Sequence, residues 1–267
     1  MRARSPAGHL RHSLPFLVGP AALVRPWVPT GIRHRIWRQR ALLTCPELTA
    51  ASLVRLRREI LAVVDERKLR SLRRLHEGGL QDVVELCDYE RKLEIAVMNT
   101  MLAGLHNRPR MRILDIGCGG GYFVAACRHL GHACEGTEVP ANRLSPTVAA
   151  AYRDVSTALR IAPMIELCIE RHRPIEVLAP ATYDMITAHK ICFNGHMRPN
   201  PWSAAEWKFF IDDARRFLVP GGQLVLDLNE DVSRYGSRRW YDAATAEYFS
   251  SVGQLVRNRV VVTNPPT

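Results

Sequence analysis

Residues 111–121 read Met-Arg-Ile-Leu-Asp-Ile-Gly-Cys-Gly-Gly-Gly, and this stretch decides the fold. The apolar run that ends at Ile116 is typical of a short buried strand. Three alternating glycines follow it, and glycine lets the backbone turn sharply and approach a ligand closely. The apolar segment Tyr122–Leu130 then predicts a helix, whose first amide groups point back toward the turn. The stretch therefore predicts a strand, a ligand-binding turn and a helix.

Strands and helices alternate from Arg110 onward. The expected strands are Met111–Ile116, Ala133–Thr137, Ile175–Leu178, Tyr183–Ala188 and Gln223–Leu228, and the expected helices are Tyr122–Leu130, Leu144–Leu159 and Ser203–Leu218. This alternation predicts an α/β fold with a Rossmann-like, doubly wound, mostly parallel sheet. In such a sheet the ligand binds at the carboxyl ends of the strands, which is where the glycine turn falls.

The composition divides the chain into three regions. Residues 1–46 form a basic, proline-rich arm, residues 47–109 a helical cap region, and residues 110–267 the α/β domain. In the cap region, Thr49 or Ser52 can cap a helix that continues to the Gly78-Gly79 pair. A second helix is expected from about Leu80 to Leu105.

The net charge of +11 is concentrated in the arm, which carries eight arginines and no acidic residue. The other 221 residues carry only +3. Such an arm could contact nucleic acid, a membrane surface or an acidic partner, could be a transit peptide, or could simply be solvated. No uncharged apolar run approaches the roughly 18 residues expected of a membrane span, so membrane contact would be peripheral.

The cysteine pattern indicates a reducing compartment. There are seven cysteines, an odd number, and none forms a Cys-x-x-Cys pair. This pattern favours free thiols over a disulfide framework or a zinc knuckle. We therefore expect a cytoplasmic protein.

Two classes of cofactor compete for the glycine turn. The dinucleotide pattern Gly-x-Gly-x-x-Gly requires a final glycine where this chain has Tyr122. Asp115, two residues before the first glycine, would repel a pyrophosphate but attract the ammonium group of a bound amino acid. These two residues disfavour an NAD-dependent oxidoreductase.

The stretch Leu-Asp-Ile-Gly-Cys-Gly-Gly-Gly-Tyr-Phe (114–123) resembles motif I of the class I S-adenosylmethionine-dependent methyltransferases. Residues 183–188, Tyr-Asp-Met-Ile-Thr-Ala, look like the fourth strand of that family, and residues 217–226 look like its Leu-x-Pro-Gly-Gly turn into the fifth strand. The resemblance implies that residues 110–267 are an S-adenosylmethionine-binding methyltransferase domain. The family places a helix and two antiparallel strands at the end. Here Ala243–Val252 can supply the helix and Leu255–Thr263 one or two short strands, and the short remainder after Asn229 suggests that the sheet is trimmed at that edge.

The resemblance also implies where the cofactor binds. The ten residues it assigns to S-adenosylmethionine are Asp115, Ile116, Gly117, Cys118, Gly119, Gly121, Tyr122, Glu138, Val139 and Ala188. Glu138 follows the second strand, and a carboxylate there can accept hydrogen bonds from both ribose hydroxyls.

The loop after the fourth strand, residues 189–202, is where the family meets its methyl acceptor. An oxygen acceptor needs a base, and histidine suits that role at neutral pH. His189 is the first candidate, followed by His196 and Asn194, although His189 could equally serve only to order the loop. His189, Cys192 and His196 also form a His-x2-Cys-x3-His pattern, but no fourth ligand lies nearby and we expect no metal. Trp202 and Trp207 could line an aromatic acceptor pocket or pack on the sheet.

The function expected from the sequence is S-adenosylmethionine-dependent O- or N-methylation of a small-molecule or sugar- or lipid-linked acceptor. One alternative is a nucleic-acid methyltransferase that uses the basic arm, although no nucleic-acid motif accompanies it. The other is a non-catalytic cofactor-binding or docking protein, because a fold does not determine a function.

Overall fold

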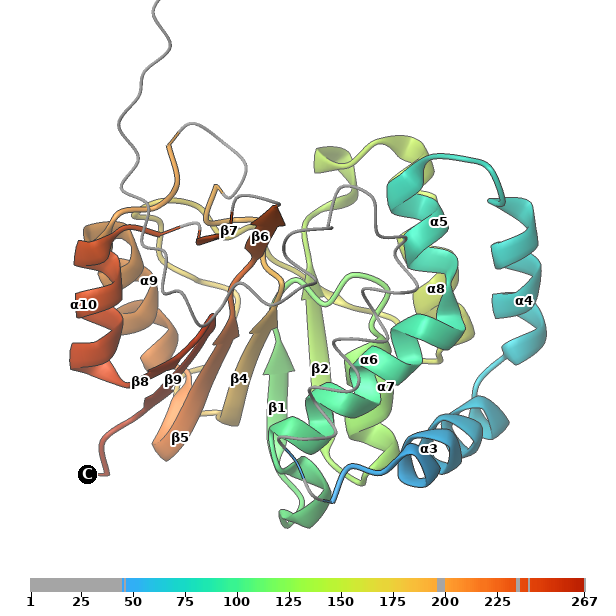
Figure 1. The fold of residues 1–267 in the computed structure, drawn as a ribbon, viewed down its shortest axis with the longest axis horizontal. Helices are drawn as coiled ribbons and strands as arrows, with labels where there is room; N and C mark the ends of the chain where they lie inside the picture. Colours follow the sequence, from blue (N-terminus) through green and yellow to red (C-terminus); the bar gives the residue numbers. More distant parts are fainter. Residues whose placement is uncertain (1–44, 46, 196–199, 234–235, 240, 267) are drawn as a thin grey trace, which may run out of the picture.

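The computed structural model describes residues 45, 47–195, 200–233, 236–239 and 241–266. Its centre is a seven-stranded sheet in the order β3-β2-β1-β4-β5-β9-β8 (Figure 1). The strands are β1 (Arg112–Asp115), β2 (Ala133–Glu138), β3 (Ile165–Glu166), β4 (Tyr183–His189), β5 (Leu218–Asp227), β8 (Gln254–Val256) and β9 (Arg259–Thr263). They run parallel except β9, which is antiparallel to both of its neighbours. The predicted Rossmann-like, mostly parallel sheet is confirmed.

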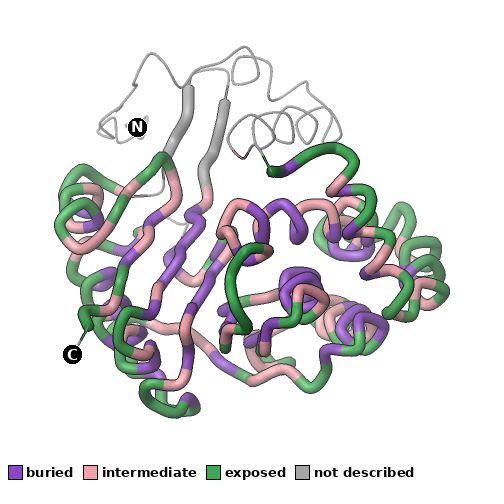
Figure 2. Tube along the Cα trace, turned by 90° about the horizontal axis from the view of Figure 1, so that it is seen from below, coloured by how far each residue is buried: buried purple, intermediate pink, exposed green. Residues whose placement is uncertain are grey.

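Side chains alternate between the two faces of the sheet and build two cores. Ile113 and Met185 face helices α7 (Tyr122–His129) and α8 (Pro146–Ala158), while Leu114 and Ile186 face α9 (Ala204–Arg215) and α10 (Ala243–Val252). Figure 2 shows the buried residues following the strands between these helical layers. Period-two alternation of apolar side chains on both faces is what a sheet covered on both sides requires.

The helical region before the sheet differs from the prediction, because each of the two expected helices is broken in two. The four helices are α3 (Ala50–Val63), α4 (Glu66–Leu75), α5 (Gln81–Cys87) and α6 (Tyr89–Leu102). Thr49 caps α3 as expected, with its hydroxyl accepting from the amide of Ser52 at 3.0 Å. Asp65 starts a new helix because its carboxylate accepts from the amide of Lys68 at 2.9 Å. The second break falls at Asp88, whose ψ of 68° is not helical.

These helices form an outer layer on one side of the domain. Helix α6 packs against α7, and α4 and α5 pack against α8 (Figure 1). The hydroxyl of Tyr122, the first residue of α7, donates to the carbonyl of Leu86 in α5 at 2.8 Å. The helical extension is thereby anchored beside the glycine turn.

The expected third strand is wrong. Residues 175–178 form no strand, although Ile175 and Leu178 are buried. The amide of Ile175 donates instead to the carboxylate of Asp213 in α9 at 2.7 Å. Ile165 takes the edge position and pairs with Thr137 of β2. A segment this short, with three apolar residues around Glu176, fits a partly buried loop as well as a strand, so the pattern alone misplaced it.

The expectation of a trimmed sheet is also wrong. Helix α10 has the bounds expected from the sequence, and β8 and β9 complete the sheet after it. The residues after Asn229 are enough for this helix and both strands because β8 has only three residues and the turn into β9 is tight, with Arg257 at a φ of 60°. A separate hairpin of β6 (Glu230–Ser233) and β7 (Gly236–Arg239), which the sequence did not predict, lies between β5 and α10.

No helix in the described part of the chain is long and apolar enough to cross a membrane. Apart from Cys45, the basic arm lies outside the described residues, so its expected contacts stay predictions.

The packing of the glycine turn can be tested with a matched pair of alanine variants. A Cβ atom at Gly121 would lie 1.6 Å from Cδ1 of buried Ile161, whereas one at exposed Gly78 would meet nothing within 4 Å. Both glycines have similar positive φ values, 83° and 77°. We expect Gly121→Ala to lose about 1–3 kcal/mol of unfolding free energy beyond the loss in Gly78→Ala, measured by urea denaturation. Equal losses would contradict this packing.

Candidate functional site

The glycine turn has an open half and a packed half. Gly117 and Gly119 have φ values of 67° and 59°, and a Cβ atom at either would meet nothing within 4 Å. At Gly120 a Cβ atom would lie 2.7 Å from Val155 and 2.9 Å from Leu86, so that residue is packed between helices. Gly117 and Gly119 are therefore the residues whose backbone borders free space at the carboxyl end of β1.

The end of β2 holds the turn in place. The amide of Gly117 donates to the hydroxyl of Thr137 at 3.2 Å, and the amide of Gly119 donates to Oε2 of Glu138 at 2.7 Å. The other carboxylate oxygen of Glu138 accepts from the amide of Val139 at 2.9 Å. Burial raises the pKa of Glu138, and the two backbone hydrogen bonds oppose that rise. Each oxygen has a further lone pair for a ligand hydroxyl.

Asp115 is a buried carboxyl group at the end of β1, with 2 % of its surface exposed. Its Oδ1 accepts from the hydroxyl of Thr187, directly opposite on β4, at 2.7 Å. Burial raises the pKa of Asp115 to about 6, against the lowering effects of His189 and the Thr187 hydrogen bond. A cationic ligand group beside this carboxyl would favour its ionised form.

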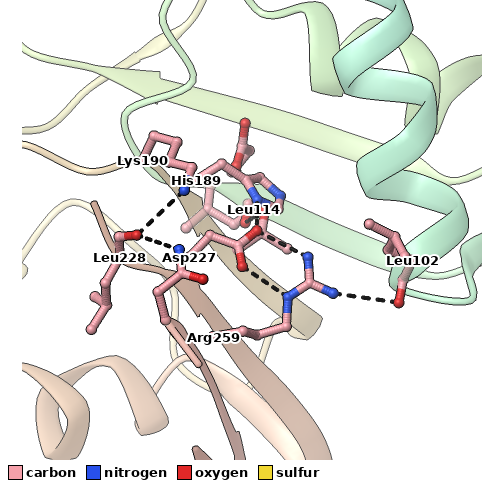
Figure 3. Close-up of polar contacts among 10 residues, drawn as sticks. Leu102, Leu114, His189, Lys190, Asp227, Leu228 and Arg259 are labelled. Carbon is pink, nitrogen blue, oxygen red and sulfur yellow. Dashed lines mark hydrogen bonds and ion pairs between the residues drawn. The ribbon is translucent and has the colours of Figure 1, made fainter. Parts of the chain in front are cut away.

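His189 is the last residue of β4, and Asp227 is the last residue of β5. Nδ1 of His189 lies 2.8 Å from Oδ2 of Asp227. Arg259 donates to the same carboxylate from the far side, Nε to Oδ1 at 2.8 Å and Nη2 to Oδ2 at 3.0 Å (Figure 3). Burial would raise the pKa of Asp227, but the hydrogen bonds and charges of His189 and Arg259 lower it well below its usual range.

The other ring nitrogen of His189 has no partner. Nε2 is buried and forms no hydrogen bond with any described residue. The ring lies against Phe123 of α7, with 4.5 Å between the ring centroids. A buried ring nitrogen without a partner is unfavourable unless a ligand or water supplies one, so this atom marks a binding position.

The loop after β4 folds back on the sheet. The amide of Lys190 donates to the carbonyl of Asp227 at 2.7 Å, and the amide of Trp202 donates to the carbonyl of Asn194 at 2.9 Å. Asn194 is buried, with 1 % exposure. His196 lies outside the described residues, so its proposed role stays a prediction.

The remaining predicted cofactor residues lie around the same turn. Ile116 and Ala188 are buried, and the side chain of Cys118 contacts Met164 rather than the open side. Tyr122 is also buried, and because its hydroxyl is bound to Leu86, its backbone amide is what remains for a ligand. Besides Gly119, eight of the predicted cofactor residues lie between the end of β1 and the start of α7 or at the end of β2, and Ala188 lies in the neighbouring strand β4.

Trp202 and Trp207 are packing residues. Both are buried, and their ring centroids lie 5.2 Å apart. Phe210 and Phe249 complete the cluster, which fills the core beneath α9 and α10. This packing favours the second of the two interpretations made from the sequence.

No three histidine, cysteine, aspartate or glutamate side chains gather as metal ligands within the described residues. The His-x2-Cys-x3-His pattern cannot be followed further, because His196 is not among them.

Sequence reasoning missed three members of this site, Thr187, Asp227 and Arg259. Asp227 carried a signal, since it is an acid in an otherwise apolar strand. Arg259 carried none, because its contact with Asp227 depends on the pairing of β9 with β5.

Comparison with models of protein families and with curated proteins gives no match. Comparison with solved structures gives similarities at low sequence identity. The PH0226 protein from Pyrococcus horikoshii OT3 is 12% identical over 67% of this chain and 92% of its own, with a TM-score of 0.44. The amino pentose methyltransferase CalS10 from Micromonospora echinaspora is 17% identical over 65% and 91%, with a TM-score of 0.41. An O-methyltransferase family protein from Burkholderia thailandensis is 13% identical over 75% and 70%, with a TM-score of 0.40.

The order of the strands is that of the class I methyltransferase sheet, with its next-to-last strand antiparallel. The fold class expected from the resemblance is therefore confirmed.

The buried carboxyl group of Asp115 predicts a pH dependence of stability. Its pKa of about 6 in the folded state exceeds the ordinary value of 3.8, so between these values the unfolded chain releases a proton that the folded chain keeps. Unfolding free energy must then fall as pH rises through this window. Asp115→Asn has no carboxyl group to titrate at this position. Its unfolding free energy relative to that of the wild type should therefore rise by about 3 kcal/mol between pH 4 and pH 7. Urea titrations at several pH values would measure it, and a constant difference would disprove it.

Proposed function

We propose that the protein is an S-adenosylmethionine-dependent methyltransferase acting on a small-molecule or sugar- or lipid-linked acceptor. The observation that carries this proposal is the pairing of a buried acid with an open glycine turn. Asp115 lies directly before the turn, and Gly117 and Gly119 leave space beside the backbone. A dinucleotide would bring a pyrophosphate to this position, and the Asp115 carboxylate would oppose it.

The residues present fit the methyl donor. Ionised Asp115 would stabilise the ammonium group of its methionine part, since a charge pair gains strength away from bulk water. Glu138, already oriented by two backbone amides, would accept from the ribose hydroxyls. When bound, S-adenosylmethionine supplies an electrophilic methyl group on a sulfonium, and the departing product is a neutral thioether.

His189 supports catalysis rather than mere binding. Its Nδ1 is occupied by Asp227, so Nε2 is the atom that can take a proton. We assign Nε2 as the base that removes the proton of an acceptor hydroxyl as the acceptor oxygen bonds to the methyl carbon. The Asp227 carboxylate orients the ring, as acidic partners of catalytic histidines do. A non-catalytic docking protein has no need of such an arrangement.

Cofactor class can be tested by thermal shift with S-adenosylhomocysteine and NADH. We expect S-adenosylhomocysteine to raise the melting temperature, because it binds the folded state alone, and NADH to leave it unchanged. Gly119→Val should lose the shift, since its side chain would enter the space beside the turn. Gly78→Val, a glycine of similar φ on the far helices, serves as the control and should keep it. Stabilisation by NADH alone would refute the proposal.

The role of Asp115 predicts a pH dependence of cofactor binding. Because its pKa is about 6, the free protein must release a proton to present a carboxylate to the ligand ammonium group below that pH. The dissociation constant of S-adenosylhomocysteine should therefore rise as pH falls below 6, approaching tenfold per pH unit. Calorimetry between pH 5 and pH 7.5 would measure it. Asp115→Asn should bind more weakly and without this slope, and a slope that persists in the variant would assign the effect to another group.

A further inference from the structure

We infer that Arg259 and Asp227 are positioning residues that hold His189 as a neutral imidazole with its proton on Nδ1, so that Nε2 is available to a hydroxyl acceptor. The catalytic use of this arrangement rests on the proposed function. The arrangement itself does not, and it can be tested without a cofactor or an acceptor.

The three residues form one row across three adjacent strands. His189 lies directly opposite Asp227 in the pairing of β4 with β5, and Asp227 lies directly opposite Arg259 in the pairing of β5 with β9. Directly opposite residues project from the same face of a sheet. The backbone register therefore places the carboxylate between the imidazole and the guanidinium, as Figure 3 shows.

Arg259 is held on both sides. Its two bonds to Asp227 form the bidentate pair that suits a guanidinium and a carboxylate. Its Nη1 donates to the carbonyl of Leu102, the last residue of α6, at 3.5 Å. Helix ends leave carbonyl groups without helical partners, and a cation there is favourable. Arg259 thus joins the helical extension to the strand end that carries the base.

The charges of Asp227 and Arg259 determine the protonation state of His189. A buried carboxylate whose only partner is a histidine favours the imidazolium, because the pair is then neutral. Here Arg259 already neutralises Asp227, so a second proton on the ring would place two cations on one carboxylate. The neutral ring still donates from Nδ1, since a carboxylate can only accept. Nε2 is then left with a free lone pair.

The other charged groups near the ring do not change this conclusion. From β1, Asp115 would favour the imidazolium when ionised, but burial raises its pKa to about 6 and so disfavours that charge in the free protein. Lys190, next in the chain, points its Nζ to the carbonyl of Leu228 at 3.5 Å and adds positive charge. From α7 the ring contacts Phe123, which is uncharged. Arg259 remains the cation in direct contact with Asp227.

The arrangement also limits the chemical class of the methyl acceptor. A neutral ring with an unpartnered Nε2 can accept a hydrogen bond and then a proton. A hydroxyl group can donate that hydrogen bond and then release that proton. We therefore infer a hydroxyl acceptor, and an acceptor carbon without an acidic proton would leave Nε2 unused.

Nitrogen NMR of the histidine rings tests the inference directly. In the free, 15N-histidine-labelled full chain at pH 7.5, long-range 1H–15N spectra should show His189 with a protonated Nδ1 and a bare Nε2, with His189→Gln identifying its signals. Arg259→Gln should move its protonation midpoint upward by about one pH unit or more, because Asp227 loses its counterion. Arg259→Lys keeps the charge and should restore most of the wild-type behaviour.

Controls separate this inference from its alternatives. Arg108→Gln removes a guanidinium that contacts Gln223, four residues before Asp227 in β5, and should leave the His189 titration unchanged. If Arg259→Gln does not fold, the wild-type spectrum still tests the inference, because it reports directly which ring nitrogen of His189 carries the proton. An imidazolium in the wild type at pH 7.5, a proton on Nε2, or an unchanged midpoint in a folded Arg259→Gln would overturn the inference. Failure of S-adenosylhomocysteine to bind would overturn the proposed function and leave this result standing.

Discussion

The register of the central strands is the constraint on which the site depends. On the face that α7 covers, Ile113 pairs with Met185 in the apolar core, and the next row pairs Asp115 with Thr187. One step further toward the carboxyl ends lie His189, Asp227 and Arg259. A shift of one residue in β4 would turn His189 to the opposite face, away from Asp227. The same backbone pairing therefore builds the core and selects which polar groups meet at its edge.

Burial of so many ionisable groups is tolerable because nearly every one has a partner. Asp227 accepts from two strands, Glu138 accepts from two backbone amides, and Asp115 accepts from Thr187. A buried charge that lacks such partners is strongly destabilising, whereas a paired and hydrogen-bonded one persists. Several buried side-chain atoms among the described residues depart from this rule, and Nε2 of His189 is the one that lies in this row of strand ends. Its lack of a partner, in a row otherwise fully satisfied, is what distinguishes a site for a ligand from a structural ion-pair network.

The predictable part of this protein is the part encoded locally. The strand, glycine turn and helix from Arg112 to His129 follow from adjacent residues, and α10 could be bounded from its own pattern. The misplaced third strand shows the limit of that approach, because the amide of Ile175 bonds to the carboxylate of Asp213, far away in sequence. The breaks at Asp65 and Asp88 were missed for a different reason, since the apolar spacing continues across them and conceals a change of helix axis.

The residues proposed for the methyl donor and those proposed for the acceptor also differ in how far apart they lie in the sequence. The residues proposed to hold the methyl donor, from Asp115 to Glu138, lie within one strand–turn–helix–strand unit, and their chemistry could be recognised from the sequence. The residues proposed to act on the acceptor come from three separate strands, with Arg259 reaching Asp227 only through the antiparallel pairing of β9. Arg259 also contacts the end of α6, so the acceptor side depends on the helical extension as well as on the sheet. The helical extension therefore contacts both halves of the site, through Leu102 at Arg259 and through Leu86 at the glycine turn, and it couples the strand end that carries His189 to the turn that carries Gly119.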